Sequence, residues 1–269
     1  MELLGILSKK QENLDNIGEE FGKKVEEAQN ELLPLIFILL NSFDYEQDGR
    51  DIVFSTANYA KIDAFMEGIN KAISEGKYYD ALLFLTNKID QQAELTKEMY
   101  RKMGLDVDSV KDVNYEELSA LMLLDLTNLE TGLYSFIRNF ISASISTGSS
   151  RKDIEEGISF LIKGGDGRKG RLFDTAVLTG DTMFAVIDRS FTFAMGEVLG
   201  IKRYRYAGGI IKDSRPFCVA RDGGIYTREE VRSWGRLGDW RGKIVGTDES
   251  TIFIYLGGYR CRHWLVPEL

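Results

Sequence analysis

The sequence predicts an α+β protein, with a mostly helical N-terminal bundle followed by a small α+β C-terminal module with short antiparallel strands. Apolar residues recur at helical spacing through residues 1–147, whereas residues 201–269 contain β-branched and aromatic runs broken by glycine turns. Residues 148–200 are predicted to be a helical connecting segment. Hydrophobic residues make up 43% of the 269 positions and charged residues 28%, which is typical of a globular protein and argues against disorder.

The helices of the bundle are predicted from the spacing of apolar residues. In residues 11–40, apolar side chains follow one another at intervals of three or four: Leu14, Ile17, Phe21, Val25, Ala28 and Leu32. The same periodicity predicts helices over residues 57–76, 78–104 and 114–146. Four amphipathic helices are enough to form a bundle with a common core.

The connecting segment begins with a small-residue linker, residues 146–153. Ser150 and Asp153 give the side-chain acceptor and early acid expected at a helix start, and a helix is predicted from there to residue 163. A second helix is predicted from about residue 172 to 199, with Gly200 as its C-terminal cap. The glycine-rich stretch between them, residues 165–170, matches Gly-x-Gly-x-x-Gly but follows a helical pattern, so we interpret it as an interhelical loop.

The length of the apolar runs and the number of cysteines limit the cellular location that we expect. No apolar run reaches the roughly 18–20 residues of a bilayer-spanning helix, and the strongest, residues 32–40, contains Pro34 and is interpreted as a buried helix. The N-terminal residues lack a signal-peptide pattern and two cysteines cannot form a disulfide framework, so a reducing intracellular compartment is expected.

Charge is distributed unevenly along the chain. Residues 201–269 hold thirteen Lys or Arg against eight Asp or Glu, a net charge of +5, and the remaining 21 basic and 34 acidic residues give residues 1–200 a net charge of −13. A modest basic excess can contact nucleic acid, but without a continuous basic stripe a mixed solvated surface is the preferred interpretation.

Strands are expected in the C-terminal module. Residues 202–213 and 250–259 are predicted to contain strands that end at Gly-Gly turns. Residues 208–235 are predicted as strand, turn, short strand and capped helix, in which Thr227 and Glu230 form a capping box. A closing strand is expected within residues 251–267.

This region resembles the phage Mu F-like minor head proteins, also called phage head morphogenesis proteins, over about residues 150–269. The likeness consists of a strand rich in aromatic and basic residues, an Asp-x-Arg-Pro-x-Cys element, an Asp-Gly turn before a helix, and a terminal Cys-Arg-His. The positions carried over are Asp213, Arg215, Cys218, Gly223, Cys261, Arg262 and His263. Where family members often have His-Pro before the terminal cysteine, this chain has Tyr-Leu-Gly-Gly-Tyr.

The resemblance implies a structural virion protein, and it leaves open whether the module also has a catalytic activity. It implies a minor head component near the portal, inside the capsid, which acts in head assembly and is present in the host cytoplasm while particles form. The implied partners are the portal, other capsid proteins and packaged DNA. A ring-forming head-to-tail connector, and therefore a homo-oligomer, is a further possibility.

The residue chemistry leaves three interpretations of the cysteines and the single histidine. Cys218, Cys261 and His263 could bind zinc, with Asp213 as a fourth ligand, because zinc takes four ligands from thiolate, imidazole and carboxylate groups. The alternative is an enzyme resembling a hydrolase: Cys218 and His263 could form the nucleophile and base of a thiol hydrolase, or a metal held by Cys218, Cys261 and His263 could carry the reaction. The preferred interpretation is that both cysteines are buried structural residues without a cofactor.

Overall fold

The computed structural model describes residues 2–110, 134–165 and 167–269. By its internal contacts the chain divides into two compact units. Unit 1 comprises Met1–Gly18, Leu85–Met122 and Leu178–Leu269, and unit 2 comprises Glu19–Phe84 and Leu123–Val177. Each unit is therefore assembled from segments that are distant in the sequence.

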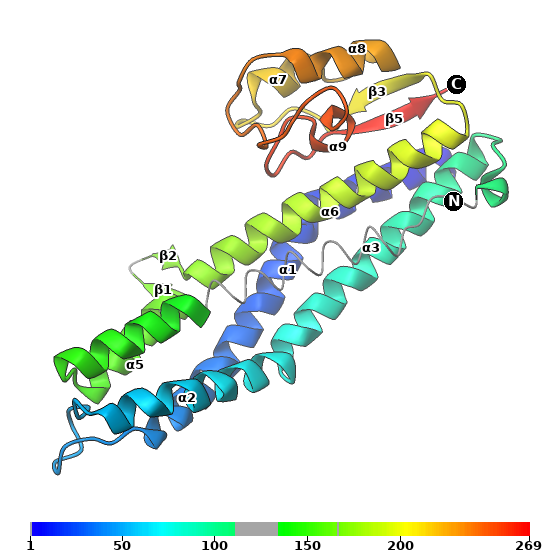
Figure 1. The fold of residues 1–269 in the computed structure, drawn as a ribbon. Coiled ribbons are helices and arrows are strands. Elements are labelled where there is room, and N and C mark those ends of the chain that lie inside the picture. The colour runs from blue at the N-terminus through cyan, green and yellow to red at the C-terminus, as the bar shows by residue number, and fades with distance from the viewer. Residues whose placement is uncertain (1, 111–133, 166) are drawn as a thin grey trace. The chain divides into compact units, whose positions relative to one another are not determined.

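Three long helices contribute residues to both units: α1 (Leu3–Leu39), α3 (Lys77–Lys102) and α6 (Arg171–Val198) (Figure 1). They confirm the predictions for residues 11–40, 78–104 and 172–199. The six apolar residues that predicted the first helix are all buried. Gly200 has a φ of 76°, and the Ile201 amide bonds back to the Gly196 carbonyl at 2.8 Å, so α6 ends in the left-handed cap that glycine favours.

Unit 2 adds the helices α2 (Thr56–Ser74), 134–147 and α5 (Arg151–Lys163), with the 3₁₀ turn η1 (Leu40–Ser42). The Ser150 side chain accepts a hydrogen bond from the Asp153 amide, which confirms the predicted start of α5. Of the predicted helix 114–146, residues 114–133 lie outside the described residues. The loop after α5 contains a two-residue hairpin, β1 (Gly164–Gly165) with β2 (Arg168–Lys169).

The apolar run at residues 32–40 is helical through Pro34 and then enters η1. Leu32, Leu33, Ile36 and Leu40 are buried, whereas Leu35 and Ile38 are exposed. The run therefore has one buried face rather than being buried all round. Over the described part of the chain, none of the helices combines the length and apolar character that crossing a membrane requires.

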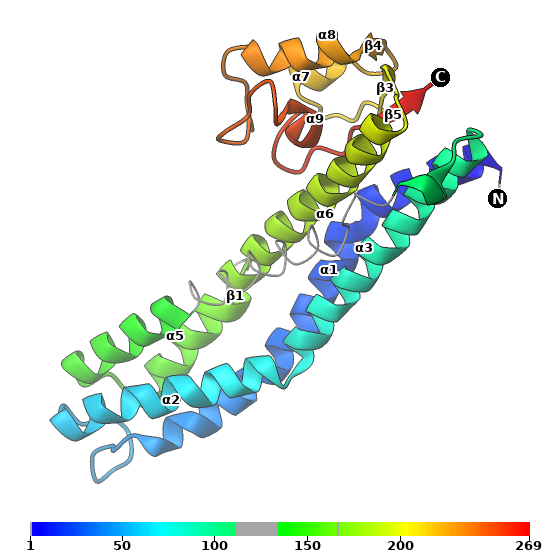
Figure 2. The same cartoon turned by 45° about the vertical axis from the view of Figure 1, so that its right-hand side comes forward.

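Unit 1 contains a three-stranded antiparallel sheet in the order β4 (Ile225–Thr227), β3 (Arg203–Ala207), β5 (Trp264–Glu268) (Figure 2). Along β3, Tyr204 and Tyr206 are buried while Arg203 and Arg205 are exposed, as a strand with one covered face requires. Four short helical elements surround the sheet: α7 (Pro216–Val219), α8 (Arg228–Ser233), η3 (Trp234–Arg236) and α9 (Ile252–Tyr255). A further 3₁₀ turn, η2 (Val107–Ser109), follows α3. The α+β fold class is confirmed.

Within residues 208–235, the short strand (β4) and the capped helix (α8) are confirmed. Thr227 and Glu230 form both hydrogen bonds of the capping box. The prediction that this segment opens with a strand was wrong, because β3 ends at Ala207 and Gly209 then adopts a left-handed φ of 70°. Residues 216–219 form the helical turn α7, with Pro216 in its first turn.

The strand predicted over residues 250–259 was also wrong. Residues 252–255 form the helical turn α9, in which the adjacent Ile252 and Phe253 are both buried. A helical turn can bury two successive side chains, and here the Phe253 ring stacks on Phe193 of α6 with centroids 4.2 Å apart. Residues 264–268 supply the closing strand instead.

Candidate functional site

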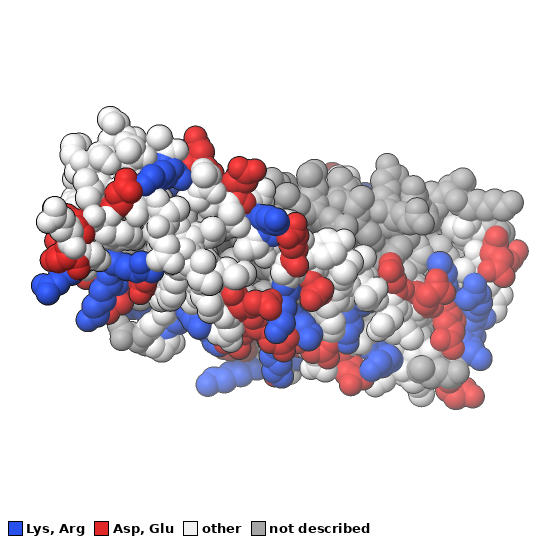
Figure 3. All heavy atoms as spheres, turned by 90° about the horizontal axis from the view of Figure 1, so that it is seen from below, with Lys and Arg blue, Asp and Glu red and all other residues white. Residues whose placement is uncertain are grey.

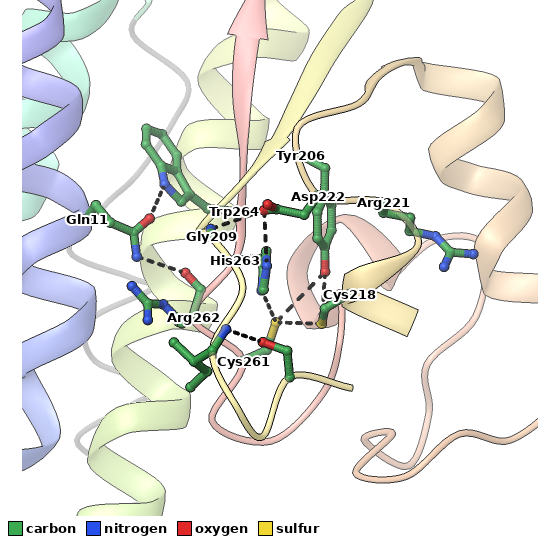
Figure 4. A network of polar contacts seen from close by, with 12 residues as sticks. Gln11, Tyr206, Gly209, Cys218, Arg221, Asp222, Cys261, Arg262, His263 and Trp264 are labelled. Carbon is green, nitrogen blue, oxygen red and sulfur yellow. Dashed lines mark hydrogen bonds and ion pairs between the residues drawn. The ribbon is translucent and has the colours of Figure 1, made fainter. Parts of the chain in front are cut away.

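The two cysteines and the histidine meet in unit 1 beside the sheet (Figure 4). Cys218 lies on α7, and Cys261 and His263 lie just before β5. The two Sγ atoms are 3.9 Å apart, and Cys261 Sγ is 3.9 Å from His263 Nδ1. One potential ligand atom from each residue lies within 4.8 Å of the others, and all three residues are buried.

Local structure holds Cys218 in place. The α7 turn follows Arg215, whose backbone carbonyl accepts the Cys218 amide at 2.9 Å and whose guanidinium donates to the Tyr259 carbonyl. The neighbouring Phe217 ring stacks on Trp240 with centroids 4.5 Å apart. Arg215, which the resemblance singles out, therefore joins the loop that carries Cys218 to the loop that leads to Cys261.

Arg189 of α6 fixes the other side of the site. This buried guanidinium donates to the carbonyls of Ile254, Cys261 and His263, at 3.1 Å for Ile254 and 2.9 Å for His263. The planar fork of an arginine can satisfy several acceptors at once. Arg189 thus anchors the backbone that carries Cys261 and His263 to helix α6.

Tyr206 of β3 reaches both sulfur atoms. Its hydroxyl donates to Cys218 Sγ at 3.3 Å and lies 4.0 Å from Cys261 Sγ (Figure 4). Its ring stacks on the His263 imidazole with centroids 4.9 Å apart. Burial, followed by the neighbouring thiol groups, raises the pKa of Tyr206 well above its ordinary value near 10. The hydroxyl therefore stays protonated and able to donate toward sulfur.

Asp222 faces the far nitrogen of the imidazole. Its Oδ1 atom lies 3.3 Å from His263 Nε2 and accepts the Gly209 amide at 3.1 Å. The Nε2 atom is buried, and among the described residues no group is aligned to form a hydrogen bond with it. Sequence reasoning used Asp222 only as a turn residue; its position just after the Cys218 turn was the available signal.

The two thiols have unlike acidities. The hydrogen bond between the sulfurs, together with burial, raises the pKa of Cys218. The same hydrogen bond lowers the pKa of Cys261 against the opposing effect of burial, with help from His263 and the Arg189 charge. The two thiols therefore titrate as one coupled pair, with a hydrogen bond between the sulfur atoms.

Gly257 closes the site against the sulfurs. A Cβ atom at this position would lie 2.5 Å from Cys218 Sγ and 2.8 Å from Cys261 Sγ. Close by, Leu256 and Arg260 have positive φ angles of 42° and 52°, which residues other than glycine rarely adopt. The loop from α9 to Cys261 is thus bent tightly around the two sulfur atoms.

The other residues singled out from sequence lie around this cluster rather than in it. Asp213 is exposed and is not one of the three converging residues. Gly223 has a φ of 76° and makes the turn before β4. Arg262 points away from the cluster and pairs with Asp15 of α1 at 2.6 Å, while its carbonyl accepts a hydrogen bond from Gln11.

The arrangement has two chemical uses. Two thiols and an imidazole can bind a thiophilic metal ion. Alternatively, Cys261, His263 and Asp222 follow the order of a thiol nucleophile, a base and an orienting carboxylate. A hydrolase also needs access to the sulfur atom, and Cys218 and Cys261 are only 2% and 4% exposed. Their burial disfavours the enzyme interpretation.

No family model matches the chain, and neither does any curated protein or solved structure.

Proposed function

We propose that the protein is a minor virion head protein that acts in head morphogenesis, bound near the portal on the inner side of the capsid. One observation carries this proposal: three of the positions on which the Mu F-like resemblance rests, Cys218, Cys261 and His263, lie together at one buried centre. Cys218 and Cys261 are 43 positions apart, yet their sulfur atoms are 3.9 Å apart. This proximity supports the proposal that the C-terminal motifs belong to one module.

The ion pairs of the basic module favour a scaffolding role over a role dominated by DNA binding. Arg228, Arg260 and Arg262 pair with Glu197, Asp181 and Asp15, which are acidic residues of α6 and α1 in the same unit. Part of the positive charge of residues 201–269 thus attaches this module to the helices. On the face drawn in Figure 3, the coloured basic and acidic side chains are interspersed. We assign contact with packaged DNA a secondary role.

The experiment is to delete residues 201–269 in the phage that encodes the protein. Full-length protein is expected to co-purify with procapsids, and the deletion is expected to abolish its incorporation and reduce the infectious titre. Immunoblots of purified particles and plaque counts measure the two effects. Asp239→Asn, at an exposed position in the same module, is the matched control and is expected to be incorporated normally.

Two outcomes would contradict the proposal. Fully infectious particles that lack the protein would exclude a role in head morphogenesis. A copy number that matches a closed ring at the portal vertex would instead favour the head-to-tail connector. Quantitative mass spectrometry of purified particles measures that copy number.

A further inference from the structure

We propose that Cys218 Sγ, Cys261 Sγ and His263 Nδ1 bind one zinc ion, which joins α7 to the segment that precedes β5. The inference is independent of the role in the virion. It rests on the spacing of the three atoms, on the groups that surround them and on their burial.

The spacing fits a tetrahedral zinc site. With Zn–S bonds of about 2.3 Å and Zn–N bonds of about 2.0 Å, tetrahedral geometry places two sulfurs about 3.8 Å apart and a sulfur and a nitrogen about 3.5 Å apart. The corresponding distances here are 3.9 Å for the sulfur pair and 3.9 Å from Cys261 Sγ to His263 Nδ1, and all three ligand atoms lie within 4.8 Å of one another. A disulfide would instead require the sulfurs to approach to about 2.05 Å.

Asp222 is placed to support the histidine ligand. Histidines that bind metal through one ring nitrogen usually present the other N–H to a carboxylate or carbonyl, which fixes the tautomer. With Nδ1 on the metal, Nε2 carries the proton, and Nε2 lies 3.3 Å from Asp222 Oδ1. Asp222 is itself held by the Gly209 amide at 3.1 Å. A small rotation of the imidazole gives Nε2 the hydrogen bond that it lacks.

Tyr206 lies against both sulfur atoms. Its hydroxyl is 3.3 Å from Cys218 Sγ and 4.0 Å from Cys261 Sγ. We assign it as a hydrogen-bond donor to thiolate, a contact that would stabilise the charged sulfurs. The chain thus supplies three ligands, and a water molecule would complete the tetrahedral coordination of the zinc ion.

Charge and burial also fit zinc. Two thiolates balance the charge of a divalent ion and the imidazole is neutral, so the occupied site has no net charge, as a buried position requires. Thiolate ligands select zinc over magnesium or calcium. The strands of this module have only three to five residues, and its α7 and α9 turns have four each. A metal link across 43 positions would therefore contribute directly to folding.

The test uses the full-length chain, reduced and purified without chelators. Elemental analysis is expected to give one zinc per chain. Replacement of zinc by cobalt is expected to produce the charge-transfer absorption of thiolate–cobalt bonds. A folded, reduced chain that binds neither zinc nor cobalt would overturn the proposal.

Variants separate ligands from neighbours. Cys218→Ser and His263→Gln are expected to lose the cobalt–thiolate spectrum or change it, whereas Asp213→Asn, the exposed control, is expected to keep it. Asp222→Asn is expected to retain one metal but to weaken its affinity by about 10- to 100-fold. If the ligand variants do not fold, the Asp222→Asn titration and the zinc content and cobalt spectrum of the wild type still decide the question. Unchanged zinc affinity in a folded Cys218→Ser variant would exclude Cys218 as a ligand and overturn the site.

Discussion

Lys10 of α1 and Asp188 of α6 form an ion pair that is withdrawn from solvent, with Lys10 Nζ 2.5 Å from Asp188 Oδ1 and side chains 0% and 1% exposed. Lys10 also donates to Thr96 of α3 and lies over the Trp264 ring of β5, 5.0 Å from its centroid. Burial lowers the pKa of Lys10, an effect that Asp188 opposes. One ammonium group thus connects four elements of unit 1.

The first prediction concerns this pair. Asp188→Asn leaves a buried ammonium without its counter-charge and is expected to reduce the free energy of unfolding by about 3–5 kcal/mol. Urea denaturation measures the change. Lys9→Met, which breaks the exposed pair with Glu12, is the control and is expected to change stability by about 1 kcal/mol or less. Equal losses of unfolding free energy for the two substitutions would contradict the prediction that burial sets the contribution of the Lys10–Asp188 pair.

The second prediction concerns the glycine behind the sulfur atoms. Gly257→Ala places a methyl group 2.5 Å from Cys218 Sγ and is expected to destabilise the fold by about 1–3 kcal/mol through overpacking. The control is Gly238→Ala, where an added Cβ meets no atom within 4 Å and φ is not left-handed. Thermal unfolding of both variants measures the difference. A Gly257→Ala variant as stable as the wild type would mean that the loop can move away from the cysteines.

The third prediction concerns Arg189. Arg189→Lys replaces a fork that serves three carbonyls with a single ammonium group, and the loss is expected to be on the order of 3 kcal/mol. Arg241→Lys, at an exposed position, is expected to be neutral. Chemical denaturation gives both values. Cys261 and His263 should also become more reactive toward thiol and imidazole reagents, because their backbone loses its anchor.

The fourth prediction concerns alkaline pH. Burial raises the pKa of Tyr204 to about 12 and places those of Tyr100 and Tyr206 well above 10. Between pH 10 and about 12 the unfolded chain has lost protons that the folded chain retains, so stability falls as pH rises, by about 1.4 kcal/mol per pH unit for each such tyrosine. Below pH 10 this contribution is complete and constant.

Unfolding measured from pH 9 to 12, with phenolate absorbance followed in parallel, checks the prediction. Tyr204→Phe removes one of the three groups and should make the decline with pH less steep. A free energy of unfolding that stays constant across this range would contradict the burial of the three hydroxyls.

The sequence by itself determined the helices and their ends, because these depend on neighbouring residues. The spacing that predicted α1, α2, α3 and α6 places apolar side chains on one face, and Ser150 and Thr227 cap helices through bonds that reach only three residues along the chain. It also indicated Cys218, Cys261 and His263 as one possible site. The same local reasoning was wrong for residues 250–259, where packing against Phe193 favours a helical turn.

Tertiary structure decided which groups complete the site. Asp222, Tyr206 and Arg189 come from a turn, a strand and a long helix, and nothing in their local sequence links them to Cys261. In the folded chain, Asp222 lies beside the histidine, whereas Asp213, which the sequence suggested as a fourth ligand, is exposed. Lys10 and Asp188 are ordinary charged residues of amphipathic helices until four elements enclose them. Burial and proximity depend on contacts between distant segments, and only the folded chain brings those segments together.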